Sequence, residues 1–450
     1  MSRTRIVRGK ITEIVGGDLT YFSESSISEY AAEVYSENSK TVIKHSDNPE
    51  KPPAGEIKAK CLVKFRPHDK YDGEYGFDWL REGDSGQKGD NWFGGIMGKY
   101  YEADNVTVFK NTNSWNNNFR KDMKMYDRKL KSYKSFSLTW KKVGKSSYLY
   151  PIPTLTLLKS KTATFNLKIE IQEKPEKLTF EFKDQEAEKY LTLNIKEIGD
   201  IRKGKYDKFN YFKITCKESF SKEQMLYVKA DGEICGAIQI HANSTSFRKN
   251  INVAIINVTT DVNGTEVTGA PISGGLDFFK KCLNQALVIP NVKEEKSDLD
   301  CTGNLLYNTF RSKFCTQGSL HSGGNGYRVT NSTGLREYLE KECKRQFGSK
   351  YNGYIKLFFI GEEGSWNGFS FFNSDFGVYF KGHNRGTVAH ETFHALNLPH
   401  TFDGINGKYT YQAGQTNNIM DYSHQSRFGS IDRKVVYLWQ WNILNPKIKR

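Results

Sequence analysis

The sequence lacks the long apolar segments that direct a chain to or across a membrane. No window approaches the roughly 18 consecutive apolar residues of a membrane span. The first ten residues carry charge but no apolar run long enough for a signal peptide. We therefore expect no membrane span, synthesis in the cytoplasm without a signal peptide, and a leaderless route for any export.

Proline and cysteine are also sparse, and neither forms a pattern. The 450 residues include 11 prolines and no long low-complexity tract, which argues against extensive disorder. The seven cysteines include no C-x-x-C pair, which argues against a zinc site built from thiolates. Cys301 and Cys315 could close a loop, but buried free thiols are the favoured interpretation for most of the seven.

Aromatic residues and positive charge are plentiful. Aromatic residues make up 14% of the chain, enough for aromatic cores, and a length of 450 residues predicts two or three domains. The formal net charge is +15, but the 66 basic residues are spread among 51 acidic ones. The densest basic run, 119–134, could track a phosphate backbone, although a solvated basic face is favoured. Nucleic acid is therefore an unlikely partner on this composition.

Changes in residue pattern divide the chain into three predicted modules. Residues 1–150 combine short apolar alternations with glycine-rich and aromatic loops, which is typical of a β-rich module. Ordinary turn chemistry is favoured over a binding surface for these loops. Pro151 and Pro153 mark a boundary, and residues 151–247 then alternate apolar and polar side chains, as in a β-sandwich-like module. We assign no chemistry to either module.

Residues 248–450 have the pattern of an α/β domain. Two nearly continuous apolar runs indicate strands that are covered on both faces. Two segments have helical spacing, and Gly348 is placed to end the second. The predicted elements are strand 251–258, helices 276–287 and 333–347, strand 354–360, and an edge-strand pair at 369–372 and 378–380. The predicted fold class is multidomain, with a β-rich N-terminal module, a β-sandwich-like middle module and a C-terminal α/β domain.

One short stretch indicates a specific chemistry. His390, Glu391 and His394 form an H-E-x-x-H pattern, and His400 follows six residues after the second histidine. On a helix, residues four apart share one face, so two imidazoles can bind one metal ion. A third histidine would complete a Zn²⁺ site with one open position, where a bound water is acidified. Glu391 could take that water's proton and pass it to the leaving amine.

This stretch resembles the metzincin zinc metalloproteases, and within them the pappalysin-like branch most strongly. The segment Asn417-Asn-Ile-Met-Asp-Tyr-Ser423 looks like the Met-turn of that clan. The resemblance covers residues 248–450 and implies a metzincin-like catalytic domain. It also implies that Met420 forms an apolar floor under the zinc and that Tyr422 stabilises the oxyanion as a second catalytic residue.

One position departs from the metzincin pattern. The clan has a glycine between the second and third histidines, where this chain has Asn397. The position must turn the chain out of the helix with a positive φ, which asparagine tolerates better than other non-glycine residues. Pro399 then prevents the helix from continuing. We expect an intact site with slight strain at Asn397.

The surroundings of the site allow further predictions. A peptide substrate could add to an exposed strand within 377–380. His383 and His424 could line the cleft, although solvated loop histidines are the favoured interpretation. Asp403 and Asp421 are expected to fix loops rather than to bind calcium.

The sequence therefore predicts a zinc metalloendopeptidase that acts on a protein or peptide substrate. Residues 1–245 weakly resemble proteins associated with bacterial type VI secretion, in Lys60–His68 and Tyr75–Trp79. That resemblance implies a secreted effector, an export or targeting role for residues 1–150, and secretion machinery or a cognate inhibitor as partners. The alternative is a non-catalytic peptide-binding or structural secretion component that retains the zinc site.

Overall fold

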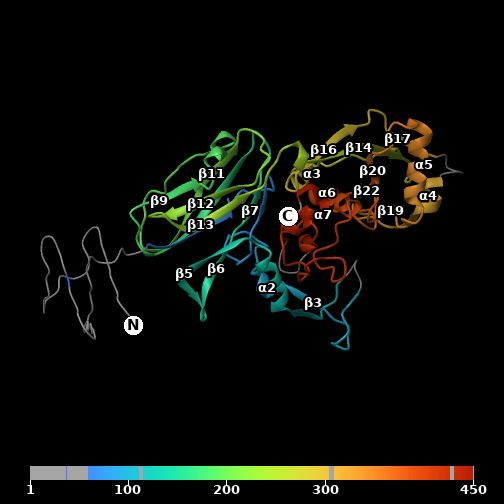
Figure 1. The fold of residues 1–450 in the computed structure, drawn as a ribbon. Helices are drawn as coiled ribbons and strands as arrows, with labels where there is room; N and C mark the ends of the chain where they lie inside the picture. Colours follow the sequence, from blue (N-terminus) through green and yellow to red (C-terminus); the bar gives the residue numbers. More distant parts are fainter. Residues whose placement is uncertain (1–36, 38–58, 111–114, 304–308, 426–429, 449–450) are drawn as a thin grey trace, which may run out of the picture. The chain divides into compact units, whose positions relative to one another are not determined.

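The computed structural model describes residues 37, 59–110, 115–303, 309–425 and 430–448. Residues 59–450 form one compact unit, and the first part of the predicted 1–150 module lies outside the described residues. The described chain is β-rich, as predicted, with main sheets of four, five and seven strands (Figure 1). Each helix in the described ranges is too short or too polar to cross a membrane.

The four-stranded and five-stranded sheets pack face to face around an aromatic core. Phe180 and Phe212 stack with their ring centroids 4.0 Å apart, and Phe65 packs against both. The first sheet has the order β1 (Lys60–Pro67), β8 (Thr162–Glu173), β11 (Gly204–Cys216) and β10 (Leu191–Leu193). The second has the order β2 (Gly76–Asp78), β7 (Thr154–Thr156), β13 (Glu233–Ile240), β12 (Gln224–Ala230) and β9 (Leu178–Phe182).

The predicted boundary at residue 150 does not separate these two sheets from what precedes it. β1 pairs antiparallel with β8 along its whole length, and β2 pairs antiparallel with β7. Both sheets therefore contain strands from the predicted modules 1–150 and 151–247. Strand alternation marks each strand locally, but it carries no information about which distant strand becomes its neighbour.

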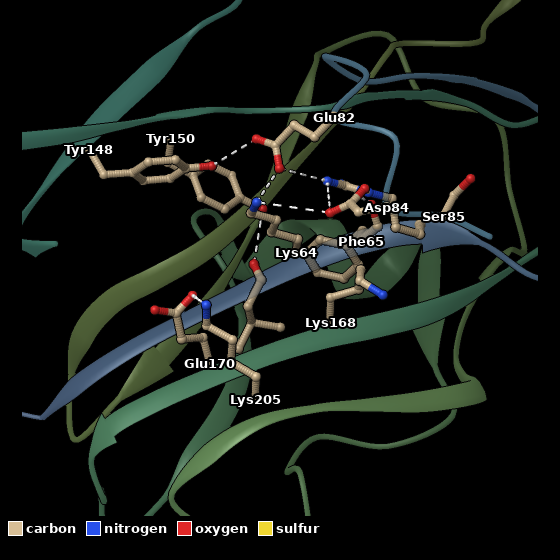
Figure 2. Close-up of polar contacts among 12 residues, drawn as sticks. Lys64, Phe65, Glu82, Asp84, Ser85, Tyr148, Tyr150, Lys168, Glu170 and Lys205 are labelled. Atoms are coloured by element: carbon tan, nitrogen blue, oxygen red, sulfur yellow. Dashed lines mark hydrogen bonds and ion pairs between the residues drawn. The ribbon is translucent and has the colours of Figure 1, made fainter. Parts of the chain in front are cut away.

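Ion pairs fasten the loop after β2 to β1. Arg66 Nη2 donates to Asp84 Oδ2 at 2.9 Å, and Lys64 pairs with Glu82 (Figure 2). The Tyr148 hydroxyl, which lies on the hairpin of β5 (Ser135–Val143) and β6 (Ser146–Pro151), donates to Glu82 Oε1 at 3.2 Å. This loop, β1 and the hairpin therefore meet in one polar cluster on the sandwich.

The basic run 119–134 is only partly solvated. It forms β4 (Phe119–Lys121), which pairs with β3 (Gly98–Tyr100), and helix α2 (Met123–Lys131). Lys129 is 1% exposed, and its Nζ lies 3.3 Å from Asp78 Oδ2, which also accepts the Tyr133 hydroxyl at 2.7 Å. A wholly solvated basic face is therefore wrong at Lys129, because it lies one helical turn after the buried Met125 and shares its face.

The seven-stranded sheet is mainly parallel and forms the C-terminal part. Its order is β15-β14-β20-β22-β21, and β16 and β17 also pair with β14. Its strands are β14 (Lys249–Thr260), β15 (Val267–Thr268), β16 (Val288–Glu294), β17 (Leu299–Asp300), β20 (Ile355–Glu363), β21 (Gly368–Phe369) and β22 (Phe376–Lys381). A separate ribbon consists of β18 (Cys315–Ser319) and β19 (Asn325–Val329).

Helices cover both faces of this sheet (Figure 1). Odd-numbered residues of β14 and β20 pack in one core cluster with α3 (Gly275–Asn284) and α6 (Arg385–Ala395). Even-numbered residues pack in another with α4 (Thr309–Phe314) and α5 (Leu335–Phe347). This arrangement confirms strands that are buried on both faces. α5 ends at Gly348 as predicted. α3 ends at Asn284 rather than at Leu287, whose φ of 53° does not fit a helix.

β22 is an inner strand rather than the sheet edge. It pairs in parallel with β20 and antiparallel with β21, in the register Gly368↔Tyr379 and Phe369↔Val378. The predicted exposed strand within 377–380 is therefore wrong, because β21 covers it. Among the described residues, the edge on this side is the two-residue strand β21.

All seven cysteines are free thiols, and six of them are buried. Cys301 and Cys315 are not joined, so the favoured prediction of free buried thiols is confirmed. Burial raises the pKa of each of these two thiols to about 12. The protonated thiol is a poor metal ligand, which agrees with a metal site made of imidazoles.

Candidate metal centre

Helix α6 places two histidines in the interior of the C-terminal part. Asn384 caps the helix, and its Oδ1 accepts the Gly386 N–H at 3.0 Å. His390 and His394 lie one turn apart on this helix, as predicted, and are 3% and 7% exposed. The helix packs against β22 and α3, so both histidine rings are surrounded by protein.

A Schellman motif ends α6 and returns the chain toward the helix. Asn397 has a φ of 69°, which confirms the predicted positive value. The Leu398 N–H donates to Phe393 O, and the Asn397 N–H donates to His394 O, both at 2.8 Å. This turn allows His400 to lie beside the helix, 3% exposed.

The three imidazoles converge on one point. His400 Nε2 lies 3.2 Å from His390 Nε2 and 3.0 Å from His394 Nε2. One ligand nitrogen from each ring lies within 4.8 Å of the other two. Zinc–nitrogen bonds of about 2.0–2.1 Å at tetrahedral angles place ligand nitrogens about 3.3–3.4 Å apart. The observed spacing therefore fits one metal ion held by three nitrogens.

Hydrogen bonds on the far side of two rings set the direction of their lone pairs. His390 Nδ1 donates to Ile419 O at 2.8 Å, and His394 Nδ1 donates to Leu398 O at 2.9 Å. Their Nε2 atoms therefore present lone pairs toward His400. Burial lowers the pKa of both rings well below the ordinary 6.5, so both are neutral. Converging lone pairs in a buried site favour a bound cation.

Glu391 provides a carboxyl group with an unusual pKa. Burial raises its pKa to about 7, although the charge of Arg433 and a hydrogen bond with the Ser370 backbone oppose this rise. A carboxyl group with this pKa can accept and return a proton near neutral pH. Ser370 directly follows β21, so Glu391 lies beside the sheet edge.

The segment 417–423, which was predicted to be a Met-turn, is held tightly next to the histidines. Met420 is fully buried, its N–H donates to Asn418 Oδ1 at 2.9 Å, and its carbonyl accepts the Thr401 N–H at 3.2 Å. Asn418 in turn exchanges two side-chain hydrogen bonds with Gln440 on α7 (Leu438–Leu444). The segment after the third histidine is thereby joined to the Met-turn.

Tyr422 lies against two of the histidines. Its ring centroid is 4.8 Å from that of His400 and 5.6 Å from that of His390. Burial and the neighbouring charge of Glu391 raise the pKa of its hydroxyl to about 12. The hydroxyl is therefore protonated at neutral pH and able to donate a hydrogen bond.

Asp403 and Asp421 fix loops, as predicted. Asp403 Oδ1 accepts the backbone N–H groups of Ile405 and Asn406 at 2.9 and 3.0 Å. Asp421 accepts the N–H of Gly414 at 2.8 Å on one oxygen and that of Thr416 at 2.9 Å on the other. Both carboxylates are thus used to order the chain around the Met-turn.

The two remaining candidate histidines differ from each other. His383 is buried, with Nδ1 2.9 Å from Phe380 O and its ring 5.5 Å from that of Phe359. The favoured prediction of a solvated loop histidine is therefore wrong for His383, because it packs against the end of the sheet. His424 is half-buried with its ring 6.4 Å from that of Tyr422, and burial lowers its pKa to about 4.

Arg433 joins the site although no sequence signal indicated it. Its guanidinium is buried, and Nη1 donates to Asp421 O at 2.9 Å and lies 3.3 Å from His390 Nδ1. Its Nη2 lies 3.4 Å from Asn384 Oδ1, at the start of α6. Burial lowers its pKa to about 10, so it stays charged at neutral pH. One buried cation therefore connects the Met-turn to the histidine helix.

Aromatic side chains pack against two of the histidines. Phe402 stacks on His400 with ring centroids 4.7 Å apart, and Phe372 meets His394 edge-on at 5.3 Å. Trp115, from the predicted 1–150 module, packs against Phe402. No chemistry was assigned to that module, because its Asn-rich loop has no pattern that relates it to the histidines.

Neither comparison with known proteins identifies a relative. No family model matches the chain, and no curated protein matches it. Three buried histidines form a cluster that could hold a metal ion.

Proposed function

We propose that the protein is a zinc-dependent endopeptidase. The observation that carries this proposal is the convergence of three buried imidazoles beside a carboxyl group with a pKa of about 7. Three protein nitrogens with a fourth position open are the usual ligand set of catalytic zinc. A zinc ion held there would supply a Lewis acid that acidifies water and polarises a substrate carbonyl.

Glu391 and Tyr422 have separate proposed roles in peptide hydrolysis. Glu391 accepts a proton from the attacking water, whose oxygen bonds to the scissile carbonyl carbon. The C–N bond then breaks, and Glu391 returns the proton to the leaving amine nitrogen. Tyr422 donates a hydrogen bond to the oxygen that becomes negative during the attack. Its raised pKa favours this role, because only the protonated hydroxyl can donate.

The position of β21 supports a way of presenting the substrate. An extended peptide could pair with this short edge strand, which continues into Ser370 beside Glu391. The order of edge strand, inner strand, histidine helix and Met-turn also supports a metzincin-like catalytic domain in residues 248–450. Edge pairing would place main-chain carbonyl groups of the peptide near the histidines.

The decisive experiment compares the zinc-loaded chain with its Glu391→Ala variant on casein and on a peptide library. We expect both proteins to bind about one zinc per chain, because Glu391 is not a proposed ligand. The variant should cleave about 10²–10⁴-fold more slowly, the usual contribution of a general base. Metal analysis by mass spectrometry identifies the ion, and N-terminal sequencing of the products locates the bond.

Other outcomes would favour other functions. Equal cleavage by both proteins would refute Glu391 as the general base. Binding of peptides without cleavage by either protein would support the alternative, a non-catalytic peptide-binding or structural secretion component. The effector role is a separate proposal, and finding the native protein confined to the cytoplasm under every condition would contradict it.

A further inference from the structure

Trp115 reaches the histidine site from outside the C-terminal sheet. Its ring centroid lies 5.1 Å from that of Phe402 and 5.5 Å from that of Tyr422. Both of these rings contact His400, at 4.7 and 4.8 Å. One aromatic layer therefore separates Trp115 from a proposed metal ligand.

The segment that carries Trp115 is fixed by side-chain amides. Asn116 Nδ2 donates to Tyr101 O at 2.6 Å, and Asn118 Nδ2 donates to Glu102 O at 2.8 Å. These bonds join Asn116 and Asn118 to the two residues that directly follow β3. The indole is thus presented by ordered backbone.

Residues 96–100, which include β3, hold the loop that follows the third histidine. The Gln412 N–H donates to Ile96 O at 2.7 Å, and the Ala413 N–H donates to the Tyr100 hydroxyl at 2.6 Å. Met97 and Tyr411 form an isolated antiparallel bridge between the same two segments. Trp115 and the loop that follows His400 are therefore parts of one packed layer.

Two aromatic side chains next to the histidines are only partly covered. Trp115 is 39% exposed beside the ring pair that contacts His400. Phe372, in the chain between β21 and β22, is also 39% exposed and contacts His394. Single exposed aromatic residues need no explanation. Trp115 lies one ring away from His400, and Phe372 lies directly against His394, so both offer apolar area near the proposed metal ligands.

We propose that Trp115 and Phe372 line an apolar subsite that binds a large aliphatic or aromatic side chain beside the scissile bond. The position of this subsite relative to the scissile bond rests on the proposed peptidase function, whereas its preference for apolar side chains does not. Ring faces and edges of this kind favour apolar and aromatic groups over charged ones. The segment between β2 and β7 would thereby contribute directly to substrate selection.

The first test measures cleavage of a library made by tryptic digestion of denatured casein and serum albumin. We expect the zinc-loaded wild-type chain to cut beside Phe, Leu, Met or Tyr. Trp115→Ala should lower kcat/KM for these peptides about tenfold and flatten the preference. Trp115→Phe should restore most of it. Unchanged preference in Trp115→Ala with wild-type zinc content would overturn the proposal.

Trp92 supplies a matched control. It is 46% exposed in the same N-terminal part, and its ring contacts Tyr126. Trp92→Ala should leave the preference and the rate unchanged. Equal losses in Trp92→Ala and Trp115→Ala would show a general effect on folding and would contradict a subsite at Trp115.

The second test separates this inference from the peptidase proposal. The same library is passed over immobilised, zinc-loaded Glu391→Ala protein, and the retained peptides are identified by mass spectrometry. Retention of apolar and aromatic peptides that is lost in Glu391→Ala/Trp115→Ala supports the subsite even if the wild-type chain cleaves nothing. Absence of both cleavage and retention by the parent proteins would overturn the subsite.

Discussion

The sandwich and the histidine site are both fully packed, but they bury opposite kinds of side chain. The sandwich interior is a set of phenylalanine rings, in which Phe65, Phe180 and Phe212 lie against one another. The site buries imidazoles, a guanidinium and carboxamides, and those of His390, His394, Arg433, Asn418 and Gln440 make hydrogen bonds within the protein. Apolar burial stabilises without regard to direction, whereas buried polar groups are tolerated only in paired arrangements. The sandwich core therefore mainly stabilises the fold, whereas the hydrogen bonds of the histidine site fix the positions of its side chains.

The Met-turn illustrates this difference. Asn418 and Gln440 exchange two hydrogen bonds between their side-chain amides, while Asn418 Oδ1 also accepts the Met420 N–H. Arg433 adds a bond to the carbonyl of Asp421. Each bond contributes modestly to the net stability, about 0.5–1.5 kcal/mol. Together they define one arrangement of the backbone beside the histidines.

The largest stability effect should come from the sandwich and leave the metal site intact. Phe212→Ala removes a fully buried ring, so the free energy of unfolding should fall by about 3–5 kcal/mol. Phe209→Ala, on the same strand but 62% exposed, should change it by less than about 0.5 kcal/mol. Urea denaturation measures both values. Loss of bound zinc from folded Phe212→Ala would show that the two regions are not separable.

Substitution of Arg433 tests the buried hydrogen bonds of the histidine site. Arg433→Met keeps much of the volume but removes the donors to Asp421 O and Asn384 Oδ1, which join the segment 417–423 to the histidine helix, so zinc affinity should fall about 10–100-fold. Arg433→Lys should recover part of the loss, because it restores the charge without the fork of donors. Competition with a chelator reports the affinity directly. Wild-type zinc affinity in Arg433→Met would show that the bonds of Arg433 do not position the helix that carries His390.

Asn397 tests the backbone that connects the helix to the third histidine. Asn397→Ala should lower the free energy of unfolding by about 1 kcal/mol, because alanine disfavours the observed φ of 69°. Asn397→Gly is the control and should cause no loss, since glycine adopts positive φ readily. Thermal unfolding of zinc-loaded proteins compares them. If Asn397→Ala were more stable than Asn397→Gly, the backbone at this position would not be strained.

An effect that depends on pH should come from Glu295, which directly follows β16 in the C-terminal part. Burial alone would raise the pKa of Glu295, but hydrogen bonds from Lys350 and Tyr351 outweigh this effect and lower the pKa to about 2. Because the folded pKa lies below the ordinary 4.5, the carboxylate stabilises the fold above pH 4.5, and this contribution disappears as the pH falls toward 2. The difference in melting temperature between wild type and Glu295→Gln should shrink over that range. A difference that is constant with pH would exclude the carboxylate charge as its source.

Several features follow from local patterns and were correctly predicted. The sequence pattern identified four strands. β8 and β13 alternate apolar and polar residues, as expected of strands buried on one face, and β14 and β20 are continuously apolar, as expected of burial on both faces. The spacing of His390 and His394 predicted their shared helix face. Asn397 was predicted to have a positive φ, because residue type limits backbone conformation directly.

The sequence by itself determined the strands, the histidine helix and the turn after it, since each depends on residues that are near one another in the chain. Only the tertiary structure decided that β1 completes a sheet with β8, that β21 covers β22, and that Lys129 is buried on Asp78. It also decided that Arg433 lies beside His390 and that Trp115 packs against Phe402 and Tyr422. Such contacts depend on how distant segments pack, and no periodicity or residue preference within one segment records that choice.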